Sequence, residues 1–478
     1  MTTITTGRIR GLEEDGVAVF KGIPYARSPF GALRLAAPVP AEPWDGVRDA
    51  LAFGPRPPQP PLFAGMPAWD PADGLDCLTV NVWTPDAGGS GLPVMVWIYG
   101  GGYVTGSADM PEYDGTRLAR ECVVVVTFNH RVGFEGYGHV DGAPDNRALL
   151  DQVLALQWVR DNIAAFGGDP GNVTIFGESA GAGAVACLLA MPSAAGLFRR
   201  AIAQSVPGMF FTPRYAAKVT RALLGLAGAG TPYEVAPEAA AEAAGQLASG
   251  EMRGDPERWG TIAFAPTPFA PVVDGEVLPD TPWNALADGA GSDVELITGY
   301  NRDEYLLFQL MSGGRTGELG AALKTLAPAD ADVVYRTAHP QASDAELLVM
   351  LMSDWMFRMP SALLADAHTG PTFAYELTWA PQPELGACHG LDVPLTFGTV
   401  HGQLAALTIG GSPHAEDLSR QFRTAWTRFA ATGDPGWPAY DPVTATTHLF
   451  DVEPRDVPDP EAASRALWSE PGFPPVDG

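Results

Sequence analysis

Short, uniformly apolar runs recur along this chain, separated by polar stretches that are rich in glycine and proline. Six of them are VMVWIY (94–99), VVVVTF (123–128), VTIF (173–176), AIAQ (201–204), VELITG (294–299) and FAYEL (373–377). Apolar runs without polar alternation are typical of strands buried on both faces, as in parallel sheets. The pattern therefore predicts a largely parallel sheet.

The segment between the second and third runs has a different periodicity. It reads NRALLDQVLALQWVRDNIAAFGG (146–168), where Leu149, Val153, Leu156 and Ile163 fall on one helical face and Gly167 can end the helix. Strand, helix, strand, turn and helix then follow one another around residue 179. This order favours an α/β class with a doubly wound, mostly parallel sheet.

Two stretches do not fit the sheet pattern. The alanine-rich segment 221–250 and the segment 306–371 are expected to form helices outside the sheet, either as a cap or as structural padding. We predict a single domain over residues 1–478, with cap insertions around 206–270 and 306–371. The proline-rich tail, 453–478, is expected to lie along the surface.

Composition narrows the class of partner. The 478 residues are 46% hydrophobic, enough for a substantial core. A formal net charge of −27 and a pI near 4.5 leave no basic stripe for nucleic-acid phosphates or anionic lipid. We therefore expect a small-molecule substrate, with no nucleic acid or membrane partner, and a monomer or weak homo-oligomer.

The N-terminus and the cysteines both indicate a cytoplasmic protein. The first residues, MTTITTGRIRGLEEDG, lack the pattern of a signal peptide, and no apolar run is long enough to cross a bilayer. The cysteines are too scattered for a zinc site and too few for a disulfide scaffold; they are Cys77, Cys122, Cys187 and Cys388. We predict reduced, mostly buried thiols and no metal.

The stretch NVTIFGESAGAGAV (172–185) changes abruptly from a strand pattern to small residues. It contains G-x-S-x-G centred on Ser179, the pattern of a strand-to-helix turn that exposes a nucleophilic serine. With 55 glycines in the chain, roughly 0.2 such motifs arise by chance, so the motif needs support from other residues. A serine hydroxyl needs a base, and the base needs an orienting acid.

A glycine triplet follows an earlier strand, in WIYGGGYVTG (97–106). Backbone N–H groups of Gly101 and Gly102, with that of Ala180, are candidates to bind a developing oxyanion, because glycine allows close approach to a substrate carbonyl. A flexible turn is the alternative interpretation.

The base and the acid are less strongly specified. His389, in GACHGLDVPLTFG (386–398), follows a predicted strand, and His401 is its competitor. The acid is one of 56 carboxylates, of which Asp303 and Glu304 are the best candidates because they follow a buried strand between Ser179 and His389.

Blocks along nearly the whole chain resemble the type-B carboxylesterase family, the α/β hydrolases that include bacterial para-nitrobenzyl esterases and the cholinesterases. Among them are FKGIPYARSPFG (20–31), DCLTVNVWTP (76–85), VMVWIYGGGY (94–103), GYNRDE (299–304) and AWTRFAATGDPGWPAY (425–440).

The resemblance implies particular roles for the candidate residues. It makes Ser179 the nucleophile, Glu304 the acid and His389 the base, and it implies an oxyanion hole of Gly101, Gly102 and Ala180. Ser205 matches a serine close to the acid in the family. Glu178 also matches the family pattern, and would either tune the site or form a structural ion pair.

This chain also departs from the family pattern. Tyr305 stands where the family usually has glycine, which makes the geometry of the acid's loop an open question. His130 and Glu135 occupy the region expected behind the oxyanion loop. The partner position for Cys77 in secreted relatives is not a cysteine here, which implies an unpaired Cys77.

These observations together predict a serine hydrolase that cleaves carboxylic esters without a cofactor. Acyl transfer, lactone or carbamate cleavage, and acyl elimination are alternatives on the same residues, and a non-catalytic binding protein is a third. Phe210, Phe211 and Phe308 are candidates for the substrate pocket, or for the core.

Overall fold

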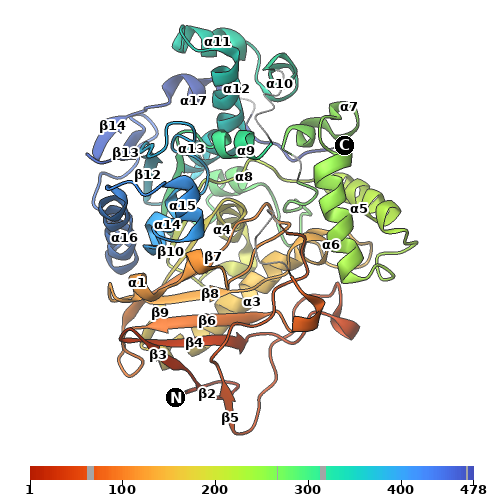
Figure 1. Ribbon diagram of the computed structural model, residues 1–478, viewed down its shortest axis with the longest axis vertical. Helices are drawn as coiled ribbons and strands as arrows, with labels where there is room; N and C mark the ends of the chain where they lie inside the picture. The colour runs from red at the N-terminus through yellow and green to blue at the C-terminus, as the bar shows by residue number, and fades with distance from the viewer. Residues whose placement is uncertain (62–68, 266, 313–318, 470–471, 478) are drawn as a thin grey trace.

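The centre of the molecule is a large twisted sheet (Figure 1). The computed structural model describes residues 1–61, 69–265, 267–312, 319–469 and 472–477. Within them the sheet has 11 strands, in the order β14 (Arg455–Pro458), β13 (Thr446–Phe450), β12 (Thr372–Leu377), β11 (Glu295–Asn301), β10 (Arg200–Gln204), β9 (Gly168–Glu178), β7 (Leu92–Ile98), β8 (Val124–Phe128), β6 (Thr79–Thr84), β4 (Val17–Pro24) and β3 (Leu12–Glu14). A small sheet of β1 (Thr2–Ile4), β2 (Gly7–Arg10) and β5 (Val47–Asp49) lies apart from it.

The six apolar runs are strands β7 to β12, and they pair in parallel. Val96 of β7, for example, lies opposite Val126 of β8 on one side and Ile175 of β9 on the other. The strands at the N-terminal edge and β14 at the other edge are antiparallel. The predicted fold class, a mostly parallel sheet of the α/β type, is confirmed.

Alternate residues of the central strands enter two separate cores, which explains the uniformly apolar runs. Val94 and Val96 of β7 face the core that contains helices α3 (Arg147–Asn162) and α4 (Ala180–Ala190). Met95 and Trp97 face the core that contains α14 (Asp392–Phe397) and α16 (Ala415–Thr432). Helices therefore cover both faces of the sheet, and its strands have no polar side.

Further helices lie away from the sheet in both segments expected as insertions (Figure 1). The first holds α5 (Pro213–Ala227), α6 (Pro237–Gln246) and α7 (Pro256–Trp259), and the second holds α9 (Tyr305–Met311), α10 (Leu319–Leu326), α11 (Ala331–Ala338) and α12 (Asp344–Ser353). The last helix of the second segment, α13 (Met359–Ala367), instead packs against β11 and β12. The division into one domain with two cap insertions stays a prediction.

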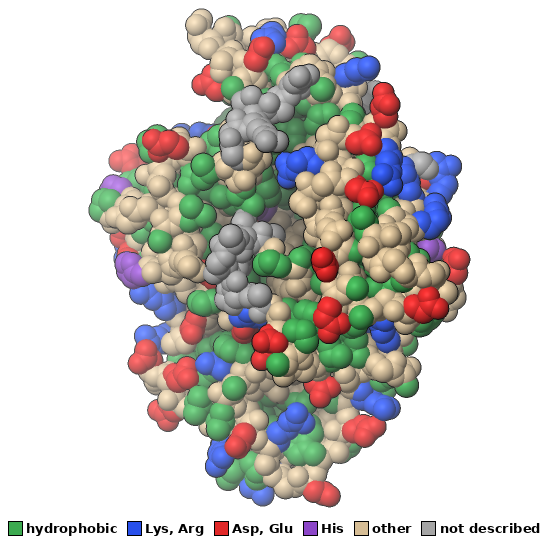
Figure 2. Space-filling view, turned by 45° about the vertical axis from the view of Figure 1, so that its right-hand side comes forward, with side chains coloured by type: hydrophobic (Ala, Val, Ile, Leu, Met, Phe, Trp, Pro, Cys, Tyr) green, Lys and Arg blue, Asp and Glu red, His purple; other side chains and the backbone are tan. Residues whose placement is uncertain are grey.

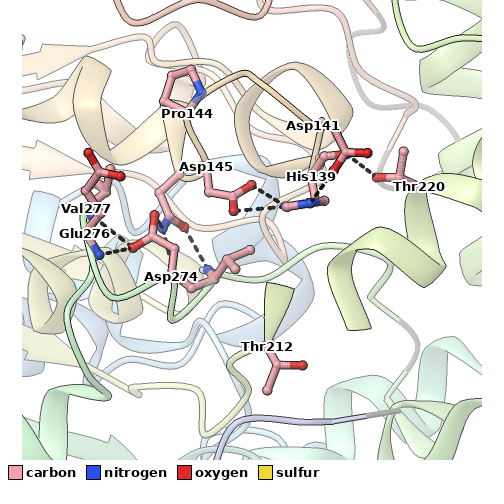
Figure 3. Close-up of polar contacts among 12 residues, drawn as sticks. His139, Asp141, Pro144, Asp145, Thr212, Thr220, Asp274, Glu276 and Val277 are labelled. Atoms are coloured by element: carbon pink, nitrogen blue, oxygen red, sulfur yellow. Dashed lines mark hydrogen bonds and ion pairs between the residues drawn. The ribbon is translucent and has the colours of Figure 1, made fainter. Parts of the chain in front are cut away.

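Polar contacts fasten the first of these segments to the loop before α3 (Figure 3). The Thr220 hydroxyl on α5 donates to the His139 carbonyl at 2.9 Å, and the His139 ring lies 3.0 Å from the Asp145 carboxylate. Asn146 exchanges two hydrogen bonds of 2.7 Å with the backbone of Val272. The segment is therefore anchored at its first helix and near its end.

The C-terminal tail lies along the surface, as expected, but it is also docked there by a strand and by two buried side chains. Strand β14 adds to the sheet edge, and Trp468 on α17 (Ala462–Trp468) is only 2% exposed. The Trp468 indole N–H donates to the Tyr335 hydroxyl at 3.0 Å, and Phe473 is also buried. Two large apolar side chains in a proline-rich stretch were the signal for this docking.

One helical stretch among the described residues, Asp344–Ala367, has the length and mean hydropathy of a membrane span. Within the most apolar part of this stretch, 83% of the residues are buried inside the protein, and buried core helices meet the same two criteria. The stretch is therefore weak evidence for a membrane segment.

Candidate active site

Ser179 lies at the sharp turn between β9 and α4. Its backbone has φ 58° and ψ −126°, an unusual conformation for a residue with a side chain. The Ser179 N–H donates to the Gln204 carbonyl at 2.9 Å and holds the turn. The turn also requires small neighbours, because a Cβ at Gly181 would collide with the Ile98 carbonyl oxygen. The chain therefore folds here as the motif around Ser179 predicts.

The glycine loop after β7 lies against this turn. A Cβ on Gly100 would stand 3.0 Å from the Ser179 Cβ. Gly101 and Gly102 have φ of 116° and 62°, which favour glycine, and a Cβ on Gly101 would collide with the Thr105 carbonyl. Within the described part of the chain, no hydrogen bond uses the N–H groups of Gly101, Gly102 or Ala180. These three donors are therefore available to a bound oxygen.

Glu304 and His389 are brought together from β11 and the loop after β12. Glu304 Oε2 lies 2.6 Å from His389 Nδ1, and the glutamate is completely buried. Its other oxygen accepts from the Ser205 hydroxyl at 2.6 Å and from the Asn301 N–H at 2.9 Å. Three donors on one carboxylate fix its orientation.

Asp303, the other candidate acid, points to a different partner. Its carboxylate accepts from the Ala387 N–H at 2.9 Å, and its own N–H donates to the Ala387 carbonyl at 2.9 Å. The neighbouring Arg302 forms an ion pair with Glu376 at 2.6 Å. Asp303 therefore fastens the loop that carries His389, while Glu304 contacts the imidazole.

Glu178 is the second carboxylate at His389. Its Oε1 lies 3.1 Å from His389 Nε2, the ring nitrogen opposite Glu304. Burial raises the pKa of Glu178 to about 8. Burial alone would lower the pKa of His389, but the Glu178 and Glu304 carboxylates outweigh it and raise that pKa to about 9. The imidazole is thus held between two acids.

The remaining candidates lie in several environments. Phe308 lies beside the site, with its ring centroid 5.1 Å from that of His389. Phe210 and Phe211 are fully buried and pack against Trp283 and Tyr215; their assignment to a pocket stays a prediction. Sequence reasoning missed Phe357, whose ring stacks on His389, because a phenylalanine in an apolar helix carries no distinguishing signal.

The competing histidine lies elsewhere. His401 is largely exposed and is 3.3 Å from Glu416 on α16. The geometry therefore favours His389, which contacts both Glu304 and Glu178.

The unusual residues behind the glycine loop serve packing. His130 stacks on Tyr99, the residue before the glycines, at 4.4 Å, and burial lowers its pKa to about 3. Glu135 is buried and forms an ion pair of 2.6 Å with Arg34. His130 thus packs against the strand end from which the loop emerges, whereas Glu135 is held in a buried ion pair.

In the described part of the chain, no group of three or more His, Cys, Asp or Glu side chains is placed to hold a metal ion. The four cysteines are free thiols: Cys77, Cys187 and Cys388 are buried, and Cys122 is exposed.

Comparisons with known proteins show the family and the fold of this chain. The model of the carboxylesterase family matches residues 1–456. The para-nitrobenzyl esterase of Bacillus subtilis is 38% identical over 97% of each chain, and the acetylcholinesterase of Bungarus fasciatus is 31% identical over 91% of this chain and 80% of its own length. The crystal structure of a carboxylesterase from Geobacillus stearothermophilus superposes with a TM-score of 0.85, at 36% identity, covering 98% of this chain and 99% of that one.

Proposed function

Because this chain belongs to the carboxylesterase family and is a carboxylic ester hydrolase that acts on small-molecule esters, we propose that it works through an acyl-enzyme formed on Ser179, with His389 as general base and Glu304 as its orienting acid. The observation that carries this proposal is the contact of 2.6 Å between His389 and the buried Glu304. It is supported by the contact of 3.1 Å between His389 and Glu178, the residue before Ser179.

In the first half of the reaction, His389 Nε2 accepts the Ser179 proton as the serine oxygen attacks the ester carbonyl carbon. The carbonyl π electrons move to oxygen, and the N–H groups of Gly101, Gly102 and Ala180 donate to this oxyanion. When the intermediate collapses, the bond to the alcohol oxygen breaks, and His389 returns the proton to it. The alcohol leaves and the acyl group stays on Ser179.

In the second half, water replaces the alcohol. His389 accepts one proton from water as its oxygen attacks the acyl carbon, and the same N–H groups bind the second oxyanion. Collapse breaks the bond to the Ser179 oxygen, which recovers its proton from His389. The Glu304 carboxylate orients the imidazole and stabilises the imidazolium in both halves.

We propose uncharged esters with an aromatic ring as the first substrates to test. Phe308 supports this choice, because its ring lies beside His389, where an aromatic substituent of a bound ester could pack against it. Figure 2 shows hydrophobic side chains around a hollow on one face of the molecule, and we propose this hollow as the entry for apolar substrates. The segments 206–270 and 306–371 would act as the cap over the site. We also propose that the enzyme is cytoplasmic.

Replacement of the nucleophile tests the proposal. Ser179→Ala should lower kcat for an aryl ester by several orders of magnitude while the protein stays folded, because the turn residue contributes chemistry more than packing. A serine-directed phosphonate should label the wild-type protein once per chain and the variant not at all.

Ser464→Ala, at a buried serine on α17, is the matched control and should keep both activity and labelling. A Ser179→Ala protein with activity within tenfold of the wild type would overturn the assignment of the nucleophile.

A further inference from the structure

The face of the His389 imidazole is covered by a phenylalanine that no step of the proposed reaction uses. The rings of Phe357 and His389 are stacked, with centroids 4.2 Å apart and planes 22° from parallel. Phe308 stacks on Phe357 in turn, at 5.9 Å and 17°. Phe357 is only 3% exposed, so it covers the imidazole from the inside of the protein.

Phe357 stands on a π-helical turn, Asp354–Arg358, between α12 and α13. Such turns are rare and redirect the side chains that they carry. A buried ion pair holds this one: Arg358 lies 2.8 Å from Asp354 and also pairs with Glu461 from the C-terminal segment. The position of the Phe357 ring is therefore set by charges buried on either side of the turn.

The same turn also supports the loop of the acid. Arg358 donates to the Arg302 carbonyl at 3.1 Å, two residues before Glu304. Ser353, one residue before the turn, accepts from the Tyr305 N–H at 3.0 Å. The backbone is thus held on both sides of Glu304 by the element that places Phe357 on His389.

We propose that Phe357 is a positioning residue of the esterase reaction, whose ring fixes the plane of the His389 imidazole and stabilises the imidazolium formed when the serine proton is taken up. This inference rests on the proposed roles of Ser179 and His389.

The physical reason is twofold. The contacts with Glu304 and Glu178 hold the two ring nitrogens but leave tilting of the ring about the line through them, which a stacked ring opposes. The face of an aromatic ring also carries negative potential and attracts a cation within about 6 Å of its centroid, with an effect of about two- to thirtyfold on an equilibrium constant. Phe357 lies well inside that distance.

The charged groups around His389 make the ring's contribution separable. Glu304 faces Nδ1, Glu178 faces Nε2, and Asp392 of α14 acts from further away, so every acid that stabilises the imidazolium lies on another element. Replacing Phe357 changes none of these charges. A fall in the pKa of His389 would therefore report the loss of the ring's attraction, because weaker burial alone would raise that pKa.

The test measures kcat, KM and the pH dependence of kcat/KM with an uncharged aryl ester. Phe357→Leu should lower kcat at least fivefold with KM within threefold of the wild type, and should move the acid limb of the profile to lower pH. Phe373→Leu is the matched control: Phe373 on β12 is buried and packs edge-on against Phe429 and Trp437, and its variant should leave the acid limb in place.

A second substitution separates shape from electrostatics. Pentafluorophenylalanine at position 357 keeps the ring's shape but reverses the potential of its face, so it should move the acid limb down as leucine does. It also keeps the test open if Phe357→Leu does not fold. The proposal would be overturned if the acid limb of the pH profile stayed in place in both variants at position 357. It would also be overturned if Phe373→Leu moved that limb equally.

The failure of this inference is distinguishable from failure of the proposed function. If the proposed function holds, phosphonate labels Ser179 in the wild type and, more slowly, in Phe357→Leu. A wild-type protein labelled elsewhere would refute the nucleophile, whereas normal labelling with an unmoved limb would refute only the role of Phe357.

Discussion

Glu178→Gln is expected to make ester hydrolysis less dependent on high pH. His389, the proposed base, must be neutral to accept the serine proton, and its pKa is raised to about 9, against an ordinary value near 6.5. This moves the expected loss of activity well above the pH of about 6 that an ordinary histidine would give. Glutamine keeps the shape of Glu178 and removes one of the two carboxylates that favour the imidazolium.

The structure sets the size of the effect. A unit charge on Glu178 Oε1, 3.1 Å from Nε2, interacts with an imidazolium by about 5 kcal/mol at an effective dielectric constant of about 20, or nearly four pKa units. That figure is an upper bound, because burial raises the pKa of Glu178 to about 8, which leaves the carboxyl mostly protonated at pH 7.

We therefore expect the apparent pKa of the acid limb to fall by at least one unit. The sign follows from charge: losing a neighbouring anion destabilises the protonated imidazole. Moving a pKa from about 9 to about 8 raises the neutral fraction at pH 7 about tenfold, from about 1% to about 9%. At pH 7, kcat/KM should rise correspondingly as a fraction of the variant's own plateau.

The assay is kcat/KM for an uncharged aryl ester across the pH range in which both proteins stay folded. Glu112→Gln is the matched control, because Glu112 is also buried but accepts from the Leu404 N–H and is not among the carboxylates that raise the pKa of His389. Its profile should coincide with that of the wild type. An acid limb that is unmoved or raised in Glu178→Gln would show that Glu178 does not supply charge to the imidazole, and would refute the reasoning.

The acid and its support give two further predictions. Glu304→Gln should lower kcat by about 10⁴, as removal of the orienting acid does in serine proteases, whereas Asp303→Asn should cost less than tenfold, because an amide oxygen still accepts from Ala387; the reverse order in kcat would make Asp303 the acid. Ser205→Ala removes a hydrogen bond of 2.6 Å to the Glu304 carboxylate. Bonds to charged groups are worth about 1.5–3 kcal/mol, so kcat should fall about tenfold or more. A kcat within twofold of the wild type would show that this bond does not contribute to catalysis.

The sheet could be predicted from the sequence because its signal is local and redundant. Each central strand is apolar on both faces, and that pattern follows from having helices on both sides, whatever the rest of the chain does. The tail could not be predicted in the same way. Its proline content is typical of a surface segment, and only the contact of Trp468 with Tyr335 and the packing of Phe473 show that it is docked.

The candidate site could be predicted where a short motif encodes it. It could not be predicted where it depends on contacts between side chains that are distant in the sequence. The turn at Ser179 is encoded by the flanking glycines, because no larger residue fits there. The contact between Glu178 and His389 joins residues more than two hundred positions apart, and no motif near either residue indicates this contact. The same holds for Phe357, which approaches His389 through a π-helical turn that an apolar helical pattern conceals.

Tyr305 departs from the family pattern in sequence, but its backbone conformation does not require the glycine that the family usually has there. Glycine is required only where the backbone is left-handed or where a side chain would collide. Tyr305 is instead the first residue of α9, with a helical backbone, and its N–H is satisfied by Ser353. The loop therefore needs no glycine to present Glu304. The tyrosine ring stacks on Phe308 at 6.3 Å and so extends, by one further ring, the aromatic surface that begins at His389.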